Sequence, residues 1–402
     1  MAGPLTGIKI IDLTTVLMGP YATQQLGDMG ADVVKIESAD GDVIRYASKG
    51  RSKGMSGLFL NNNRNKRSLV LDLKQKEGLE VLLKLVGKSD VLISNMRPGA
   101  MRRLGLTYQE IAPINEKLVF ITCSGFGSGG PYEGRPAYDD IIQTMAGIPG
   151  LIARAYGEEP TFVPSNFCDR VTGLKVVSSV VSALFHREHS GKGQSVNIPM
   201  FETMVEFLMS DHLGGHTFVP PMEQTGYKRI VNPNRRPYRT KDGYLALMLY
   251  NDKQWAEFLG IVGKPELLEQ EPFATFSSRS ENVVEVYNFV RETLAGRTTA
   301  EWLEAFKASD LAHAPVKELE DLFDDEHLQA IGFFPELMHP SEGRIRATAI
   351  PDRWSDSQPE FQRHAPRLGQ HSREVLLELG LSNDEIQALA DKNIINRVEP
   401  HS

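Results

Sequence analysis

Cysteine is scarce in this chain of 402 residues, which contains only Cys123 and Cys168. Two cysteines in so long a chain do not make a disulfide framework, which fits a reducing compartment. Long hydrophobic runs are also missing, since the most apolar stretch, 176–185, is interrupted by serines and is far shorter than the ~20 residues of a membrane span. No basic segment precedes an apolar core near the N-terminus, which runs directly into the strand-like residues 8–11. We therefore expect a cytoplasmic protein without a membrane segment.

Excess positive charge and metal-ligand motifs are absent as well. Lysine and arginine total 44 against 52 aspartates and glutamates, a net charge of −8, which argues against a general nucleic-acid-binding protein. Neither H-E-x-x-H nor C-x-x-C occurs, so we expect no metal site. Internal repeats and low-complexity tracts are also missing. The composition, with 41% hydrophobic and 24% charged residues, is that of a globular protein of more than one ordinary domain.

The first half of the chain alternates strand and helix patterns. Strand-like segments cover residues 8–13, 32–37, 91–94 and 118–122, and apolar residues at helical spacing separate them. Pro20 suits the first turn of the helix after the first strand. Strands separated by helices imply parallel βαβ units. The sequence therefore predicts an α/β fold with a Rossmann-like large domain over residues 1–200.

The second half changes in character after a long helical pattern over residues 169–186. A further helix covers about 200–213, so residues 201–224 form a predicted helical linker. Residues 238–240 and 244–247 flank the turn Lys241–Asp242–Gly243, which is typical of a β-hairpin. Two capping boxes, Thr298 with Glu301 and Ser382 with Glu385, mark helix starts. We predict a smaller α+β domain at 225–330.

A nicotinamide-binding domain is one reading of the first βαβ unit, because Glu37 ends the second strand where a ribose-binding acid would lie. The fingerprint G-x-G-x-x-G is missing from the first turn, which offers only Gly19. The glycines of 125–130 follow a different strand and lead into Pro131 and a polar loop. A dehydrogenase is therefore rejected.

Two clusters of basic residues are candidates for binding a phosphate group. The first is Arg64–Arg67, before the strand-like residues 69–72, and the second is Arg97, Arg102 and Arg103, after the strand at 91–94. Such residues are usually solvated surface. Arginines at the carboxyl ends of parallel strands, however, lie where phosphate ligands bind. We therefore expect both clusters to be candidates for a phosphate-containing ligand.

Asp169 opens the long helix, and its bland interpretation is an N-cap or first-turn acid, stabilised by ~0.3–1 kcal/mol. Composition alone favours that interpretation. Cys168 beside it suggests a thiol nucleophile, but no histidine stands out as its base, so we interpret it as a packing residue. The segment Cys123–Ser124–Gly125 lacks the G-x-S-x-G pattern of serine hydrolases.

Nine short segments in order along the chain resemble the class III CoA-transferases, the group that contains formyl-CoA transferase and carnitine CoA-transferase. Each segment alone is a weak signal, and together they cover almost the whole chain. They are residues 5–12 with Gly19–Pro20, 26–37, 63–68, 95–99, 130–132, 135–139, 191–194, 241–244 and 365–371.

This resemblance implies that Asp169 accepts the acyl group, with Gly173 at the family spacing. It also implies an architecture in which residues 331–402 return to the large domain and two chains interlock as a homodimer. The implied CoA contacts are Val16, Leu71, Lys74, Asn95, Met96, Arg97, Arg103 and Tyr138. No permanently bound cofactor is implied, because coenzyme A and acyl-CoA are substrates, and a carboxylic acid is the partner substrate.

The chemistry of a carboxylate suits that role. With an ordinary pKa near ~3.9, Asp169 is expected to be ionised at neutral pH and to need no general base. It would form an aspartyl–acyl anhydride and then an aspartyl–CoA thioester. The glycine-rich segment 127–130 is a candidate shield of these intermediates from water. Succinyl-CoA is a reasonable donor, since arginines hold carboxylates well.

The departures from the family bear on the alternatives. The four-glycine loop of formyl-CoA transferase has no counterpart around residues 227–236, and Leu17 stands where that enzyme has glutamine, so a larger acceptor than oxalate is favoured. An acyl-CoA racemase of the same fold is the main alternative. Its histidine falls at Tyr138 and its glutamate near Arg239, which leaves two-base proton transfer without agents. A non-catalytic CoA-binding protein would be expected to have lost Asp169.

Overall fold

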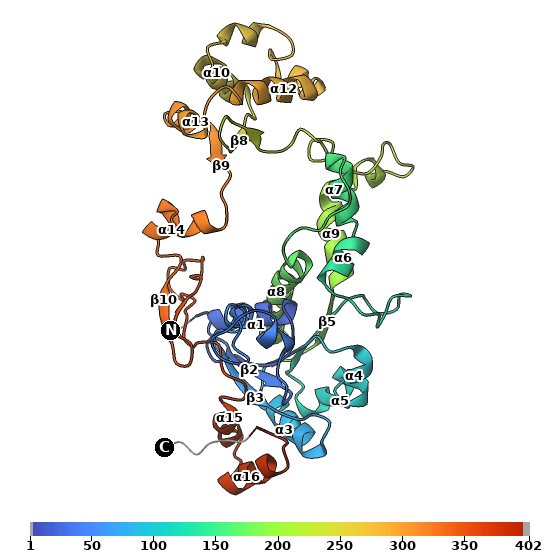
Figure 1. Cartoon of the computed structure of the whole chain (residues 1–402). Helices are drawn as coiled ribbons and strands as arrows, with labels where there is room; N and C mark the ends of the chain where they lie inside the picture. Colours follow the sequence, from blue (N-terminus) through green and yellow to red (C-terminus); the bar gives the residue numbers. More distant parts are fainter. Residues whose placement is uncertain (1–2, 397–402) are drawn as a thin grey trace. The chain divides into compact units, whose positions relative to one another are not determined.

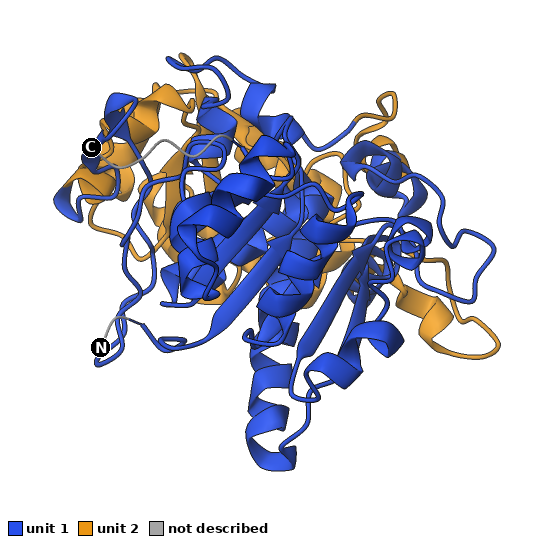
Figure 2. Ribbon diagram, turned by 90° about the horizontal axis from the view of Figure 1, so that it is seen from below, with its two compact units in different colours: residues 1–149, 162–210, 330–402 blue, residues 150–161, 211–329 orange. Residues whose placement is uncertain are grey.

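A computed structural model describes residues 3–396. The chain divides into two compact units (Figure 2). Unit 1 comprises residues 1–149, 162–210 and 330–402, and unit 2 comprises 150–161 and 211–329. Three separate stretches of sequence thus build unit 1, with unit 2 inserted between them.

Unit 1 is built on a parallel sheet of six strands, which confirms the predicted α/β fold (Figure 1). The order across the sheet is β3-β2-β1-β4-β5-β6 and all neighbouring pairs are parallel, which is the strand order of the Rossmann fold. The strands are β1 (Lys9–Leu13), β2 (Asp32–Glu37), β3 (Lys66–Val70), β4 (Val91–Ser94), β5 (Val119–Ser124) and β6 (Ser195–Pro199).

Helices connect these strands and extend the unit. Pro20 lies in the first turn of α1, as the sequence predicts. The helices whose residues lie in unit 1 are α1 (Met18–Asp28), α2 (Gly57–Leu60), α3 (Lys76–Val86), α4 (Pro98–Arg103), α5 (Tyr108–Ile111), α6 (Asp139–Met145), α8 (Phe167–Ser190), α15 (Ser372–Glu378) and α16 (Asn383–Asp391), and β10 (Glu336–His339) and β11 (Gly343–Arg346) add a two-stranded sheet. Helices α7 (Ile148–Tyr156), α9 (Met200–His212) and α14 (Glu326–Ala330) cross from one unit to the other.

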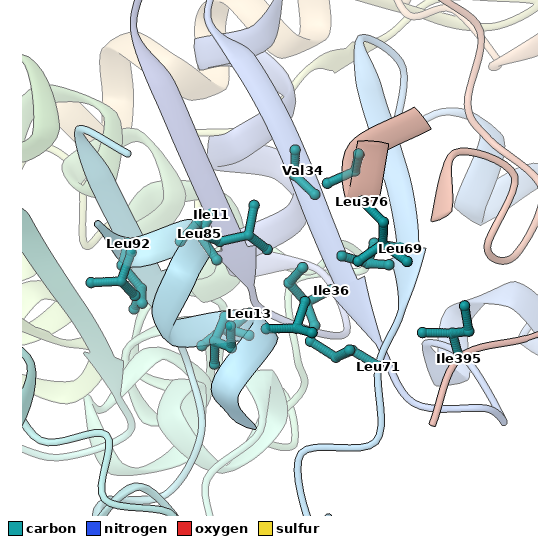
Figure 3. Packing of buried hydrophobic residues seen from close by; sticks show 14 of the residues in the cluster. Ile11, Leu13, Val34, Ile36, Leu69, Leu71, Leu85, Leu92, Leu376 and Ile395 are labelled. Atoms are coloured by element: carbon teal, nitrogen blue, oxygen red, sulfur yellow. The ribbon is translucent and has the colours of Figure 1, made fainter. Parts of the chain in front are cut away.

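One face of the sheet carries the apolar core of unit 1. Side chains such as Ile11, Val34 and Leu69 pack there against Leu85 of α3 and Leu376 of α15 (Figure 3). Since successive side chains of a strand point to opposite faces, every second residue of the central strands belongs to this cluster. The C-terminal helices α15 and α16 thus complete a core that the N-terminal strands begin.

The opposite face of the same strands is covered by α1 and α8, which pack against each other and on the sheet. This face is charged: Asp12, Lys35 and Lys66 point to it and are all 0% exposed. Lys66 Nζ lies 3.2 Å from the Asp12 carboxylate and donates to the Pro20 carbonyl of α1. Buried charges are tolerated only when they are paired, and these are. The network therefore ties α1 to the strand ends near which the loop residues 14–17 lie.

Unit 2 contains a three-stranded antiparallel sheet, β7 (Tyr238–Arg239), β8 (Tyr244–Met248) and β9 (Ala312–Pro315). Strands β7 and β8 form the hairpin that the sequence predicts, and both hydrogen bonds of the Thr298–Glu301 capping box are present. Its helices are α10 (Asp252–Ile261), α11 (Phe276–Glu281), α12 (Val283–Leu294) and α13 (Thr299–Phe306), whose aromatic side chains supply much of a separate core.

Residues 3–396 contain neither a membrane-spanning helix nor a metal-binding cluster. In that range no helix is both long and apolar enough to cross a bilayer. The same residues form no cluster of three or more His, Cys, Asp or Glu side chains arranged to hold a metal ion.

Candidate active site

A cavity of about 260 Å³ lies in unit 1 at the carboxyl ends of β1, β4 and β5. Successive strands are added on one side of β1 up to β3 and on its other side from β4 onward, so the strand order switches between β1 and β4. Open α/β sheets bind ligands at such a switch point. The cavity is lined by Thr15, Val16, Met18, Asn95, Met96, Arg97, Pro98, Cys123, Ser124, Gly125, Phe126, Gly134, Arg135, Ala137, Tyr138, Asp169 and Met200.

Asp169 is the one carboxylate in this lining. It lies in the first turn of α8, whose N-cap is Asn166, so it is not the capping residue. Its side chain is 9% exposed, and among the described residues no hydrogen bond to its carboxylate oxygens is found. The acid is therefore held at a helix start and directed to a cavity, where its oxygens are available to a ligand.

The position of Asp169 is fixed through its backbone by a second buried acid. Its N–H donates to Asp139 Oδ1 at 2.9 Å, and Asp139 Oδ2 accepts from Gln143 Nε2 at 2.7 Å. Gln143, 0% exposed, also accepts from the Val163 N–H at 3.0 Å, which anchors the segment before α8. Sequence reasoning missed this pair, although its i,i+4 spacing on a helix was visible.

Burial raises the pKa of the Asp169 carboxyl from its ordinary value to about 7, and the nearby negative charge of Asp139 adds to the effect, while Arg170 opposes it. The sequence-based expectation of an ordinary acid, ionised throughout the neutral range, is therefore wrong. Desolvation, which no sequence pattern reports, is the reason.

Close packing by two glycines shapes the cavity. A Cβ on Gly173 would lie 2.9 Å from Tyr21 Cδ1 and 3.0 Å from the Met18 carbonyl oxygen, so only glycine lets α8 approach α1 this closely one turn after Asp169. A Cβ on Gly125 would lie 2.2 Å from Ala137 Cβ. These contacts bring Met18 beside Asp169 and Ala137 beside the end of β5, around one hollow.

A second hollow, of about 550 Å³, shares Met96, Arg97, Pro98 and Gly134 with this cavity. It adds Arg102 and Arg103 from the last turn of α4. Its one acid, Glu133, accepts a hydrogen bond from the Gly129 N–H at 2.9 Å. The two hollows are therefore neighbours, with three arginines lining one and Asp169 lining the other, and an elongated ligand with an anionic end would suit this layout.

Most of the residues implied by the resemblance meet in these two hollows. Val16, Asn95, Met96, Arg97 and Tyr138 line the cavity with Asp169, and Arg103 lines the second hollow. Two implied contacts line neither hollow. Leu71 is 2% exposed within the apolar core, and Lys74 is exposed beyond β3.

The first basic cluster is not a phosphate site, which corrects the sequence-based hypothesis. Lys66 and Arg67 lie within β3 rather than in a loop. Arg64 pairs with Asp28 at 2.8 Å, Lys66 with Asp12 at 3.2 Å, and Arg67 with Asp32 at 2.6 Å. These residues are 8% exposed or less, and each basic group is already paired with a carboxylate, of which Asp12 and Asp28 are buried and Asp32 is partly exposed. The second cluster, in contrast, keeps its guanidinium groups in an open hollow.

Cys168 is 0% exposed, and burial raises the pKa of its thiol to about 12, with the charges of Asp139 and Asp169 adding to the effect. A thiol held in its protonated form is a poor nucleophile. The packing interpretation of Cys168 is confirmed by its burial. Cys123, also buried and free, contributes to the cavity wall.

The sequence matches the family described as "CoA-transferase family III" over residues 5–372. The chain belongs to this family. It is 32% identical over 401 residues to the succinyl-CoA–L-malate CoA-transferase beta subunit of Chloroflexus aurantiacus, covering 98% of both chains. It is 30% identical over 412 residues to the formyl-CoA:oxalate CoA-transferase of Streptomyces coelicolor, covering 98% of this chain and all of that one. This family III member is therefore an enzyme with CoA-transferase activity.

A solved structure supports the same fold. A CAIB/BAIF family protein from Brucella suis superposes on this family III enzyme with a TM-score of 0.80 at 30% identity. The superposition covers 94% of this chain and 100% of that one. The family assignment thus extends to the three-dimensional arrangement of the chain.

Proposed function

We propose that this enzyme moves coenzyme A from a donor acyl-CoA to a carboxylic acid with Asp169 as the nucleophile. The observation that carries the proposal is the buried Asp169 carboxylate, directed to a cavity that adjoins an arginine-lined hollow. An acyl-CoA has the same layout, with a reactive thioester at one end and phosphates at the other. Of the two structural interpretations of Asp169, the N-cap is excluded because Asn166 occupies the cap position, while Asp169 is indeed an acid of the first helical turn.

The reaction begins when an Asp169 carboxylate oxygen attacks the thioester carbonyl carbon of the donor. The carbon–sulfur bond breaks, CoA thiolate leaves, and a mixed aspartyl–acyl anhydride remains. The thiolate then attacks Asp169 Cγ, which expels the donor acid and leaves an aspartyl–CoA thioester.

The second half of the reaction repeats these steps in reverse order with the acceptor. The acceptor carboxylate attacks Asp169 Cγ and displaces the thiolate. A second anhydride, between Asp169 and the acceptor, is formed. The thiolate attacks the acceptor acyl carbon, so that the new acyl-CoA departs and Asp169 is regenerated. The thioester energy is conserved at each step, and no ATP is consumed.

Asp169 attacks only when it is ionised, so its raised pKa gates the first step. With a pKa of about 7 the carboxylate is a stronger base than an ordinary aspartate, and it keeps a large ionised fraction at neutral pH. Burial thus raises reactivity at the cost of requiring loss of a proton before attack.

Coenzyme A is expected to lie along the two hollows. Arg97 and Arg103 suit its phosphates, because guanidinium groups bind phosphate oxygens in a bidentate manner. Val16, Asn95, Met96 and Tyr138 would lie nearer the thioester, and contacts by the Leu71 backbone and Lys74 would extend the path.

A dicarboxylyl-CoA such as succinyl-CoA is the proposed donor. Arg135 is the basic residue of the cavity that is not assigned to the CoA phosphates, so it is available to an acyl group that carries a second negative charge. The Chloroflexus relative, whose name includes succinyl-CoA, agrees with this choice.

The racemase alternative is not favoured. Moving an α-proton between two faces of a carbon requires two bases. No histidine is among the residues that line the cavity, and Tyr138 occupies the position of the racemase histidine. Asp169 would have no second base to work with.

An interlocked homodimer in the cytoplasm is the proposed state of the enzyme. One face of α8 carries Leu174, Val181 and Phe185, which are 51%, 39% and 67% exposed. Their spacing of seven and four residues places them on one stripe of the helix. An apolar stripe of this kind is typical of a subunit interface.

Replacing Asp169 with alanine tests the proposed function. The Asp169→Ala variant should fold and lose CoA transfer by at least a thousandfold, because the covalent route has no nucleophile. Asp140→Ala is the matched control, since Asp140 is an exposed acid near the site that does not line the cavity, and it should stay within threefold of wild type.

The assay should follow exchange between succinyl-, acetyl- and formyl-CoA and a panel of carboxylic acids. We expect succinyl-CoA to be the best donor. Turnover of Asp169→Ala within tenfold of wild type would remove Asp169 from the mechanism. Faster transfer from acetyl- or formyl-CoA would contradict the dicarboxylyl donor while leaving the nucleophile in place.

A further inference from the structure

The loop between β1 and α1 adopts a backbone conformation that its sequence does not favour. Val16 has a φ of +71°, in the left-handed region, where β-branched residues are rarely found. Val16 and Thr15 both line the cavity that contains Asp169. Unfavourable backbone of this kind persists only where the surroundings hold it in place.

Side chains from elsewhere in unit 1 provide that hold. The Val16 N–H donates to Asp42 Oδ1 at 3.1 Å, and Lys35 Nζ donates to the Thr14 carbonyl at 2.7 Å. Lys35 and Asp42 are paired with each other at 2.9 Å, and they are 0% and 1% exposed. The two members of one buried ion pair therefore hydrogen-bond to the loop backbone on both sides of Thr15.

Asn95 holds Thr15, the residue between Thr14 and Val16, by two hydrogen bonds. Its Oδ1 accepts from the Thr15 N–H at 3.0 Å, and its Nδ2 donates to the Thr15 carbonyl at 2.8 Å. Three successive residues of the loop are thus hydrogen-bonded to side chains of β2, of the residue before η1 (Val43–Tyr46) and of the residue after β4.

The Lys35–Asp42 ion pair is itself held by neighbouring charged groups, so the position of the loop is well fixed. The Asp42 N–H donates to Glu37 Oε1 at 3.0 Å, and Glu37 is paired with Arg45 at 2.7 Å. These groups are buried, and buried hydrogen-bonded charges hold their geometry strongly because breaking one pair leaves an uncompensated charge.

We propose that Lys35 and Asp42 are positioning residues, which hold loop 14–17 in its unfavourable conformation as a preformed wall of the acyl-CoA site. Neither residue lines the cavity, so their role is exerted through Val16 and Thr14. A loop held before the substrate arrives saves the ordering cost that binding would otherwise carry. The predicted consequence falls on acyl-CoA binding rather than on the chemical step.

The test removes both charges together in the full-length double variant Lys35→Met with Asp42→Ala. Removing one partner alone would leave an unpaired buried charge and endanger folding, whereas loss of both is tolerated far better. The matched control is Arg64→Met with Asp28→Ala, which removes another buried ion pair of unit 1, at 2.8 Å, that does not touch the loop.

Two measurements are made on each protein: amide hydrogen exchange of residues 14–17 by mass spectrometry, and KM and kcat with succinyl-CoA and acetyl-CoA. We expect the double variant to exchange at least tenfold faster in the loop, with the sheet strands unchanged, and its KM for both donors to rise at least tenfold with kcat within threefold. The control should leave loop exchange and KM within threefold of wild type.

Adding Val16→Gly to the double variant gives a further check, since glycine adopts a positive φ without a side-chain penalty. The KM of this triple variant should be at least threefold lower than that of the double variant. Unchanged loop exchange, exchange accelerated equally throughout the sheet, or no recovery with glycine would each overturn the positioning role. Because this role presupposes CoA transfer at Asp169, the exchange measurement separates the two: an inactive wild-type protein would defeat the proposed function, while loop exchange would still judge the ion pair.

Discussion

At the scale of single residues, the site depends on one carboxyl group whose surroundings alter its acidity. The resemblance suggested Asp169, the proposed nucleophile, because it implies an aspartate before Gly173. Its pKa was not predictable, because the value of about 7 comes first from burial and then from Asp139, and neither is readable from neighbouring residues in the sequence. The Asp139–Gln143 pair was missed although its i,i+4 spacing was visible, because its contact with the Asp169 backbone joins residues 30 positions apart.

This pKa predicts the pH dependence of transfer. Asp169 attacks as the anion, so kcat/KM should rise about tenfold per pH unit below 7 and level off above it. Asp139→Asn removes a negative charge that raises the Asp169 pKa, so the midpoint should move to lower pH. Asp140→Asn, the control, should leave the midpoint in place, since burial, Asp139 and Arg170 are the causes of the Asp169 shift. A midpoint that moves upward in Asp139→Asn, or a flat profile between pH 5 and 8, would contradict the assignment.

At the scale of elements, strands that are buried along almost their whole length were the most predictable. The bounds of β2 and β4 agree with the predicted segments 32–37 and 91–94, because both strands are buried. Strand β6 was missed, since Ser195–Pro199 alternates polar and apolar residues, lies at the sheet edge and ends in proline. The basic residues of 64–67 were misread as loop ligands because their acidic partners, Asp12, Asp28 and Asp32, are distant in sequence.

The crossing of α1 and α8 gives a prediction at this scale. In Gly173→Ala the new Cβ would meet Tyr21 and the Met18 carbonyl, so the helices must separate, at a cost of about 1–3 kcal/mol in unfolding free energy. Transfer should weaken as well, because Met18 and Asp169 share the cavity wall. Gly260→Ala in α10 is the control: nothing lies within 4 Å of its added Cβ, and better helix propensity should slightly stabilise the protein. Thermal unfolding and kcat/KM check both variants, and a stabilised, fully active Gly173→Ala would contradict the packing account.

At the scale of the whole molecule, the parallel sheet and the hairpin of unit 2 followed from the alternation of patterns along the chain. All four predicted strands of the sheet begin within one residue of the predicted start, whereas the order of the strands across the sheet became known only from the structure. The convergence of Val16, Asn95 and Asp169 depends on that order, since it places the ends of β1 and β4 side by side.

The assembly is tested by its mass in solution. The wild-type protein should sediment as a species of twice 44.7 kDa. Phe185→Glu places a charge on the exposed apolar stripe of α8 and should shift the protein toward monomer or impair its folding. His186→Glu adds the same charge about a third of a turn away and should leave the dimer intact. A wild-type monomer, or a Phe185→Glu protein that sediments as wild type, would contradict the interface.

The central claim is that Asp169 is acylated during transfer, and trapping tests it most directly. The enzyme is mixed with succinyl-CoA in deuterated solvent without an acceptor, treated with hydroxylamine, digested and analysed by mass spectrometry. The aspartyl anhydride and the aspartyl–CoA thioester are both activated acyl derivatives of Asp169, so Asp169 should appear as its hydroxamate. The amount of donor acid released should equal the amount of enzyme active sites. Asp169→Ala, treated in parallel, should yield no modified peptide. The contradictory result is an unmodified Asp169 peptide together with deuterium at the α-carbon of the acyl group, which is the signature of an isomerase.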